Sequence, residues 1–177
     1  SALLAGLAIE QGTRLVASEV APHRAELVAA NLRGYAGEFA PVTVVADGTR
    51  PAWAPDSFAK VLADVPCTGL GALRRRPESR WRRQPSDVPA LVELQKKLRA
   101  GAIAATKPGG VIGYVTCSPH AAETTEVVAT AESVDVLHAA DYLPEVPDAV
   151  LGDYLQLWPH RHGTDAMFLA LLRRQSR

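Results

Sequence analysis

Short, unbroken apolar runs alternate with helix-like segments along this sequence. Runs at residues 13–18, 42–46, 58–63 and 111–115 are typical of strands buried on both faces. Helices are predicted at 1–11, 21–33, 88–106 and 121–131, further strands at 134–138 and 167–172, and a long loop at 65–86. This alternation predicts an α/β fold with a mostly parallel sheet and helices on both faces.

Polar and reactive side chains follow the predicted strands. Glu19, Asp47 and Asp64 stand at the ends of three of them, and Cys117 follows the fourth. Open parallel sheets bind ligands outside the carboxyl ends of their strands. A single acid at such a place often only caps the next helix. Four such residues at one edge of the sheet predict a binding site.

Both cysteines of the chain fall in polar turns at this edge. Cys67 lies in DVPCTGLG (64–71) and Cys117 in TCSPH (116–120). A lone cysteine is often only a small buried apolar residue. Each turn here leads toward a helix start, whose partial positive charge lowers a thiol pKa, so reactive thiols are predicted. Two cysteines make no disulfide framework, and a reducing cytoplasm is expected.

Charge is segregated along the chain although the net charge is zero. Residues 74–83 hold six arginines and one glutamate, a local +5, so the remainder carries −5. Such a run is usually a solvated surface. Here it forms a basic patch on an otherwise acidic body, directly after the Cys67 turn.

Other classes of site are not favoured. His160, His162 and Asp165 suggest a metal site, but no further cluster completes it, so no metal is predicted. No apolar run reaches the length of a membrane span, and no signal peptide is expected.

Several motifs, in order and spacing, resemble the Sun/Fmu family of RNA cytosine-5 methyltransferases. They are DVPCTGLG, RRRPESRW, Leu94-Gln95, KPGG, YVTCS and WPHRHGTDAMF (158–168). Glu19 with Arg24 and Asp47 with Gly48 look like the acidic strand ends of the family. Together the motifs cover essentially the whole chain. The resemblance implies a Rossmann-like class I methyltransferase fold with an antiparallel C-terminal strand, S-adenosylmethionine as cofactor, and RNA, most often ribosomal RNA, as substrate.

The resemblance also implies roles for individual residues. Cys117 would add to carbon 6 of cytosine, which makes carbon 5 nucleophilic enough to take a methyl group. Cys67 would assist breakdown of the adduct. Asp64 would contact cofactor and base, and donation to the base needs a raised carboxyl pKa, which burial could supply. The implied cofactor-binding residues are Glu19 (ribose hydroxyls), Asp47 (adenine amino group), Arg24, Gly48, Asp64 and Pro66.

With this resemblance, the arginine run at 74–83 is predicted to hold RNA phosphates, because it directly follows the Cys67 turn. The predicted RNA-binding residues are Arg74, Arg75, Arg76, Arg80 and Trp81, the last by stacking on a base or by packing in the loop.

The sequence departs from the family in three places. The glycine-rich cofactor loop and its preceding strand would stand before Ser1, so residues 1–177 are expected to be a methyltransferase domain without these parts, belonging to a longer protein. Val65 replaces a usual alanine, and Ala166-Met167-Phe168 replaces glycine followed by two aromatic residues. Two alternatives stay open: a DNA cytosine-5 methyltransferase that uses Cys67, and a non-catalytic RNA-binding or assembly protein.

Overall fold

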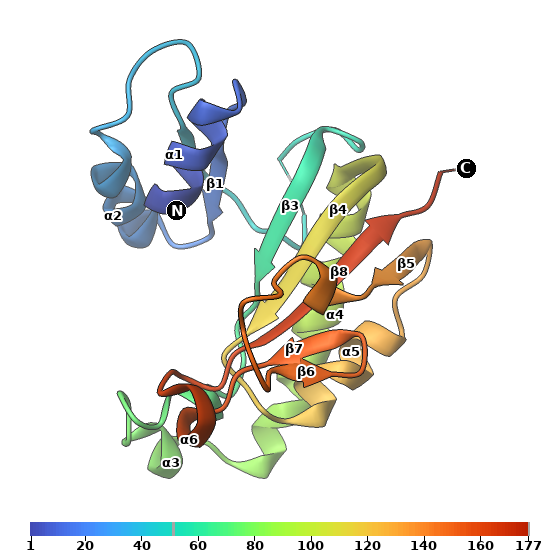
Figure 1. Ribbon diagram of the computed structural model, residues 1–177. Helices are drawn as coiled ribbons and strands as arrows, with labels where there is room; N and C mark the ends of the chain where they lie inside the picture. Colours follow the sequence, from blue (N-terminus) through green and yellow to red (C-terminus); the bar gives the residue numbers. More distant parts are fainter. Residues whose placement is uncertain (51, 177) are drawn as a thin grey trace. The chain divides into compact units, whose positions relative to one another are not determined.

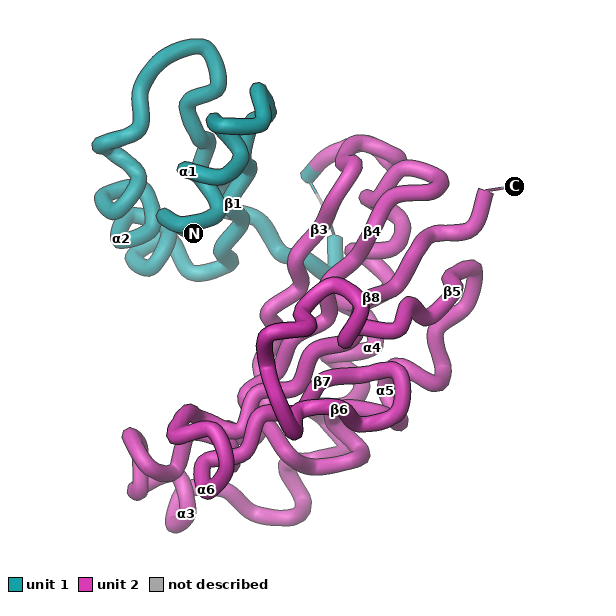
Figure 2. Tube along the Cα trace, in the orientation of Figure 1, with its two compact units in different colours: residues 1–52 teal, residues 53–177 magenta. Residues whose placement is uncertain are grey.

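The computed structural model describes residues 1–50 and 52–176. It divides into two compact units, unit 1 (Ser1–Ala52) and unit 2 (Trp53–Arg177), shown in Figure 2. Each unit has its own sheet, of two strands in unit 1 and six in unit 2 (Figure 1).

Unit 1 is a strand–helix–strand segment preceded by a helix. Its elements are α1 (Ala2–Glu10), β1 (Val16–Glu19), α2 (Pro22–Leu32) and β2 (Val42–Val45). The two strands are parallel and in register, with Glu19 opposite Val45. Pro22 begins α2, at a position where a backbone N–H has no partner within the helix, so proline loses no hydrogen bond there. This register places the residues after both strands at one edge of the sheet.

Unit 2 contains a second strand–helix–strand segment, which carries both cysteines. Its main elements are β3 (Phe58–Asp64), α4 (Val88–Ala105), β4 (Thr106–Thr116), α5 (Thr125–Ala129), β5 (Val134–Leu137), β6 (Val150–Leu151), β7 (Tyr154–Gln156), α6 (Pro159–His162) and β8 (Phe168–Arg174). Strand β4 pairs with β3 in parallel and with β8 antiparallel. Both β5 and β7 pair with β8, and β6 pairs with β7.

Alternation along β8 separates the two faces of this sheet, since successive strand residues point to opposite sides. Phe168, Ala170 and Leu172 are fully buried in a core that includes residues of α4 and α5. Leu169 and Leu171 pack on the other face against a smaller cluster built around Leu155. Burial of both faces of β8 explains why its sequence is a continuous apolar run.

The predicted α/β fold with parallel strand–helix–strand segments and an antiparallel C-terminal strand is confirmed. Helix α4 ends where predicted, but β4 begins at once and runs through the KPGG segment. Its register with β3 shifts between Phe58 and Lys60, and a Cβ at Gly110 would lie only 2.6 Å from the Ala59 carbonyl oxygen. Glycine therefore allows this close approach of the two strands.

Other differences concern short elements. The expected loop at 65–86 contains three short helices, η1 (Leu70–Ala72), α3 (Ser79–Arg82) and η2 (Pro85–Asp87). The helix predicted at 121–131 is split into η3 (Ala121–Glu123) and α5, because Thr124 leaves helical geometry at φ −121° and ψ −99°. The β6–β7 hairpin and α6 were not predicted. Within residues 1–50 and 52–176, no helix has both the length and the apolar character to cross a bilayer.

Candidate active site

Two turns at the carboxyl ends of β3 and β4 bring the thiols together. The Sγ atoms of Cys67 and Cys117 lie 3.4 Å apart. The Gly71 N–H donates to the Cys117 carbonyl oxygen at 3.0 Å, and a Cβ on Gly71 would lie 2.6 Å from that oxygen and 2.2 Å from the Ala166 carbonyl oxygen. The last glycine of DVPCTGLG is therefore required by close backbone packing. It fixes the Cys67 turn against the Cys117 turn.

The two thiols differ in burial and in acidity. Cys67 is 8% exposed, whereas Cys117 is partly exposed. The hydrogen bond with the Cys67 thiol lowers the pKa of Cys117 to about 7, while that bond and burial raise the pKa of Cys67. Burial penalises a thiolate more at the inner sulfur, so the proton shared by the pair stays on Cys67. The arrangement supplies a thiolate at Cys117 with a thiol donor beside it.

The expected cause of thiol acidity is corrected by this geometry. A lowered pKa was predicted at both cysteines from helix starts, but at Cys67 the pKa is raised. At Cys117 the largest effect comes from the neighbouring thiol. The elements that follow the turns, η1 and η3, are short 3-10 helices. The aligned dipole of a long helix is therefore not the main cause.

Asp64 ends β3 next to the thiol pair. It lies opposite Val115 in the parallel register, two residues before Cys117. Its carboxyl group is exposed on one side, and the protein around its other side raises its pKa by desolvation. The raised pKa has the direction expected for a carboxyl group that donates to a base. Pro66 is exposed between Asp64 and Cys67, and its carbonyl oxygen accepts a hydrogen bond from Gln95.

The basic segment 74–83 is held by the turn before β8. Asp165 is 8% exposed and forms an ion pair with Arg75, whose Nε lies 2.8 Å from Oδ2. Arg74 approaches the same carboxylate and donates to the Gly163 carbonyl oxygen. This pairing holds the pKa of Asp165 below its usual value.

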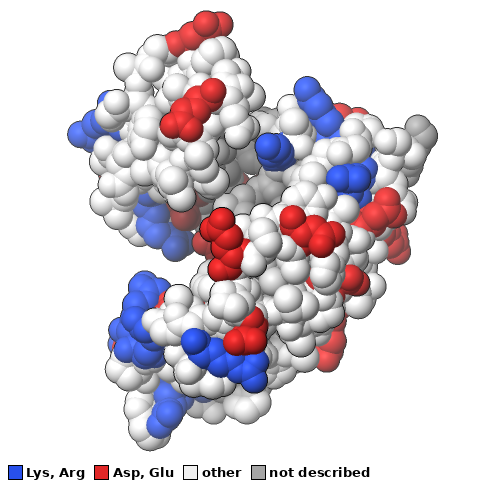
Figure 3. Space-filling model, viewed as in Figure 1, with Lys and Arg blue, Asp and Glu red and all other residues white. Residues whose placement is uncertain are grey.

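The other three predicted RNA-binding residues do not take part in this pairing. Arg76, Arg80 and Trp81 are exposed, Trp81 at 80%, and among the described residues none of the three side chains has a polar partner within the chain. On the face shown in Figure 3, Lys and Arg side chains gather where Figure 1 places α3 and α6. A basic surface therefore adjoins the cysteine turns.

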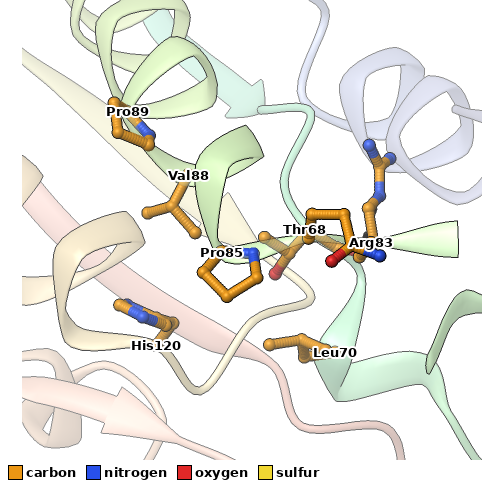
Figure 4. A pocket seen from close by; sticks show the side chains of 8 residues that line it. Thr68, Leu70, Arg83, Pro85, Val88, Pro89 and His120 are labelled. Atoms are coloured by element: carbon orange, nitrogen blue, oxygen red, sulfur yellow. Dashed lines mark hydrogen bonds between the residues drawn. The ribbon is translucent and has the colours of Figure 1, made fainter. Parts of the chain in front are cut away.

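A pocket lies between the two turns and the start of α4. Thr68, Leu70, Pro85, Val88 and His120 surround it (Figure 4). Its lining is mainly apolar, with Arg83 at the rim and donating to the Thr68 carbonyl oxygen. Flat apolar groups such as nucleobases suit a wall of this kind.

Two of the three residues considered for a metal, His162 and Asp165, have other partners. His162 accepts from the Trp158 N–H through Nδ1 at 2.8 Å, and its Nε2 lies 3.0 Å from the Pro147 carbonyl oxygen. Asp165 is engaged by arginines. In the part of the chain that the structure describes, no three His, Cys, Asp or Glu side chains are grouped to hold a metal ion.

Unit 1 places Glu19 and Asp47 at the ends of its paired strands. Glu19 Oε1 accepts from the Ala21 N–H at 2.9 Å and contacts Arg24 at 3.3 Å. Asp47 Oδ1 accepts both donors of Thr49 at 2.8 Å, and these bonds lower the Asp47 pKa. Both acids thus make local contacts of the helix-capping kind, but each acid uses only one of its two carboxylate oxygens for them. Among described residues, the second oxygen of each carboxylate has no hydrogen-bond partner.

Comparison with known proteins bears on the whole chain. The family described as 16S rRNA methyltransferase RsmB/F matches residues 1–173. This chain belongs to the RsmB/F methyltransferase family. "Putative methyltransferase Rv1407" of Mycobacterium tuberculosis (strain ATCC 25618 / H37Rv) is 54% identical over 98% of the chain and 38% of its own length. "Ribosomal RNA small subunit methyltransferase F" of Serratia proteamaculans (strain 568) is 29% identical over 97% of the chain and 37% of its length. The chain thus spans well under half of these relatives.

Solved structures agree with an RsmB/F fold. The crystal structure of PH0851 superposes with a TM-score of 0.79 at 25% identity, covering 91% of this chain and 37% of that protein. NSun6 from Pyrococcus horikoshii, solved with SFG, gives 0.75 at 22% identity over 93% of this chain and 42% of that one, which shows a shared fold.

The cofactor of this RsmB/F chain is S-adenosylmethionine. The residues of unit 1 fit such a group, because two carboxylates at one sheet edge each keep an oxygen available for hydroxyl or amino donors. Arg24 holds Glu19 in place, and Gly48 lies in the turn after β2. Glu19 and Asp47 therefore remain the candidate cofactor ligands.

Sequence reasoning missed two groups near the thiols. Asp165 was weighed only as a metal ligand, and its pairing with Arg75 was not foreseen. Glu123 was not singled out, although it is fully buried between the two cysteine turns. Asp165 lies in a loop and Glu123 ends η3, and their partners Arg75 and Thr68 are 90 and 55 residues away in the sequence. Spacing along the chain therefore gave no signal.

Proposed function

We propose that this RsmB/F chain carries the catalytic residues for methylation of cytosine carbon 5 in ribosomal RNA, with Cys117 as the nucleophile. The observation that carries the proposal is the 3.4 Å approach of Cys67 to Cys117, which lowers the Cys117 pKa to about 7. A thiol with that pKa is about half thiolate at neutral pH, far more than an ordinary thiol, and the thiolate is the attacking form.

In the proposed reaction the two thiols have different roles. The Cys117 thiolate forms a bond to carbon 6, and the displaced electron pair makes carbon 5 nucleophilic. S-adenosylmethionine would supply the methyl group and leave as S-adenosylhomocysteine. A general base then takes the proton from carbon 5, the carbon 5–carbon 6 double bond re-forms, and the sulfur–carbon 6 bond breaks with its electron pair returning to Cys117. The Cys67 thiol, beside the departing sulfur, stabilises the returning thiolate by donating to it.

Other residues have supporting roles in this proposal. Asp64, with its raised pKa, donates to the base and adjoins the cofactor. Glu19 and Asp47 bind the cofactor. Arg76, Arg80 and Trp81 contact RNA, with Arg74 and Arg75 holding the basic segment to the turn at Asp165.

Trapping with 5-fluorocytosine tests the proposal, because fluorine at carbon 5 cannot leave as a proton does. The intact protein should form a cofactor-dependent covalent adduct with fluorinated ribosomal RNA. Cys117→Ala should abolish the adduct, and Cys67→Ala should retain it. Capture of fluorinated DNA through Cys67 would support a DNA methyltransferase instead. Normal RNA binding without adduct or methyl transfer would support a non-catalytic binding protein.

A further inference from the structure

Glu123 is a buried carboxylate that the proposed reaction does not use. It ends η3 and is 0% exposed. Among the described residues no Lys, Arg or His forms an ion pair with it. Burial of an unpaired carboxylate is costly unless hydrogen bonds replace its hydration. The neighbours of Glu123 therefore have to supply those bonds.

Four donors surround this carboxylate. Oε1 accepts from the Thr68 N–H at 2.8 Å and from Gln95 Nε2 at 3.1 Å. Oε2 accepts from Thr68 Oγ1 and Ser118 Oγ, both at 2.6 Å. An amide N–H can only donate, so the oxygen that faces two of them must be unprotonated. The set of donors matches an ionised carboxylate.

The donors come from the two catalytic turns. Thr68 directly follows Cys67, and Ser118 directly follows Cys117. Gln95, on α4, also donates to the carbonyl oxygen of Pro66 at 2.9 Å, directly before Cys67. Tyr114 donates to the backbone oxygen of Glu123 at 2.8 Å, which fixes η3 to β4. One carboxylate thus ties both turns to each other and to the sheet.

We infer that Glu123 is a positioning residue for the thiol pair: it holds the two turns at the separation at which the sulfurs share a proton, and its negative charge keeps that proton on Cys67. The inference rests on the proposed function, because it deepens the division of roles between the two cysteines.

The charge acts unequally on the two sulfurs. The raised pKa of Cys67 comes first from the hydrogen bond with Cys117, from burial and from the Cys117 charge, and the charge of Glu123 adds a smaller contribution in the same direction. The carboxylates that act on Cys117 are Asp64 and Asp165, and the cation of Arg75 also faces it. Tyr114 is the remaining titratable group near the pair, and burial raises its pKa, so it stays neutral. Among these carboxylates, Glu123 is thus the one whose charge acts on the inner thiol, and it adds to the effect of burial there.

Two variants separate the charge from the bonds. Glu123→Gln removes the charge but keeps an amide of the same shape, whose NH₂ can face the two hydroxyl groups. Ser118→Ala removes one bond to the Cys117 turn and leaves the charge in place. Glu126→Gln is the matched control, because Glu126 is exposed on α5 three residues away.

The readout is modification of each cysteine by a small thiol reagent in the intact protein, measured by mass spectrometry from about pH 5.5 to 9.5, a range that brackets the pKa of an ordinary thiol. Glu123→Gln should raise the ratio of Cys67 to Cys117 modification several-fold. Ser118→Ala should move the midpoint for Cys117 upward by about half a pH unit or more, toward the value of a free thiol. Glu126→Gln should change neither quantity.

The inference would be overturned if both variants fold and neither the ratio of Cys67 to Cys117 modification nor the pH midpoint for Cys117 changes. The assay needs neither RNA nor cofactor, so its outcome is independent of methyl transfer. If the fluorinated RNA forms no adduct but the variants shift the thiols as expected, the proposed function fails and the positioning role of Glu123 stands.

Discussion

Arg75 and Asp165 form a two-point ion pair between segments 90 residues apart in the sequence. The pair fixes the beginning of the basic segment 74–83 to the turn before β8. Its consequence is a division within that segment, because Arg74 and Arg75 pair with Asp165, while Arg76 and Arg80 are exposed and their side chains have no polar partner among the described residues. Arg76 and Arg80 are therefore the ones expected to respond to RNA.

Removal of the exposed arginines should weaken RNA binding and its dependence on salt. Arg76→Ala with Arg80→Ala should lower the slope of log affinity against log salt by about 0.7 for each phosphate that is no longer neutralised. The measurement is a fluorescence titration of the intact protein with RNA at several salt concentrations. Lys97→Ala, an exposed charge on α4, is the control. An unchanged slope in the double variant would assign RNA binding to another surface.

The reactivity of Cys117 should depend on pH with a midpoint near neutrality. Its pKa is lowered to about 7, so the thiolate fraction, and with it the alkylation rate, should rise between about pH 6 and 8 and then level off. Cys67→Ala removes the donor that favours the thiolate, so its midpoint should move up toward about 8.5. If the midpoint for Cys117 in the native protein already lies at about 8.5, the two sulfurs do not share a proton in solution.

Substitution of Gly71 should destabilise the protein. A Cβ there would lie 2.2 Å from the Ala166 carbonyl oxygen and 2.6 Å from that of Cys117, so both turns would have to move. Gly71→Ala should lower the free energy of unfolding by about 1–3 kcal/mol, as in other overpacked sites. Gly34→Ala is the control, since no atom lies within 4 Å of its added Cβ. Denaturant unfolding compares the two, and equal stability would contradict the packing described.

Substitution of the strand-end carboxylates should weaken cofactor binding. Glu19→Ala and Asp47→Ala each remove an acceptor for hydroxyl or amino groups, at a cost of about 1.5–3 kcal/mol, or roughly tenfold to a hundredfold in affinity. Calorimetric titration of the intact protein with S-adenosylmethionine measures the effect. Glu26→Ala, exposed on α2, should bind as the native protein does. If both strand-end variants bind the cofactor with native affinity, Glu19 and Asp47 are not cofactor ligands.

The positions of the main strands and helices were predictable because local patterns encode them. The apolar runs before Asp64 and Thr116 are strands, and Pro22 begins α2 as expected. Contacts between distant segments were not predictable. The split at Thr124 places Glu123 against Thr68, and β4 runs on through Gly110 because β3 passes close by. Such features depend on which distant segment of the chain packs nearby, and the local sequence carries no information about that.

The sequence by itself determined that Cys67 and Cys117 would stand in turns at the ligand-binding edge of the sheet, since each turn directly follows an apolar run that reads as a strand. Only the tertiary structure decided which sulfur is the acidic one. Acidity depends on burial, on the 3.4 Å approach of the second thiol, and on charges brought in from η3 and the turn before β8. Those distances arise from packing between remote segments, so they exist only in the folded chain.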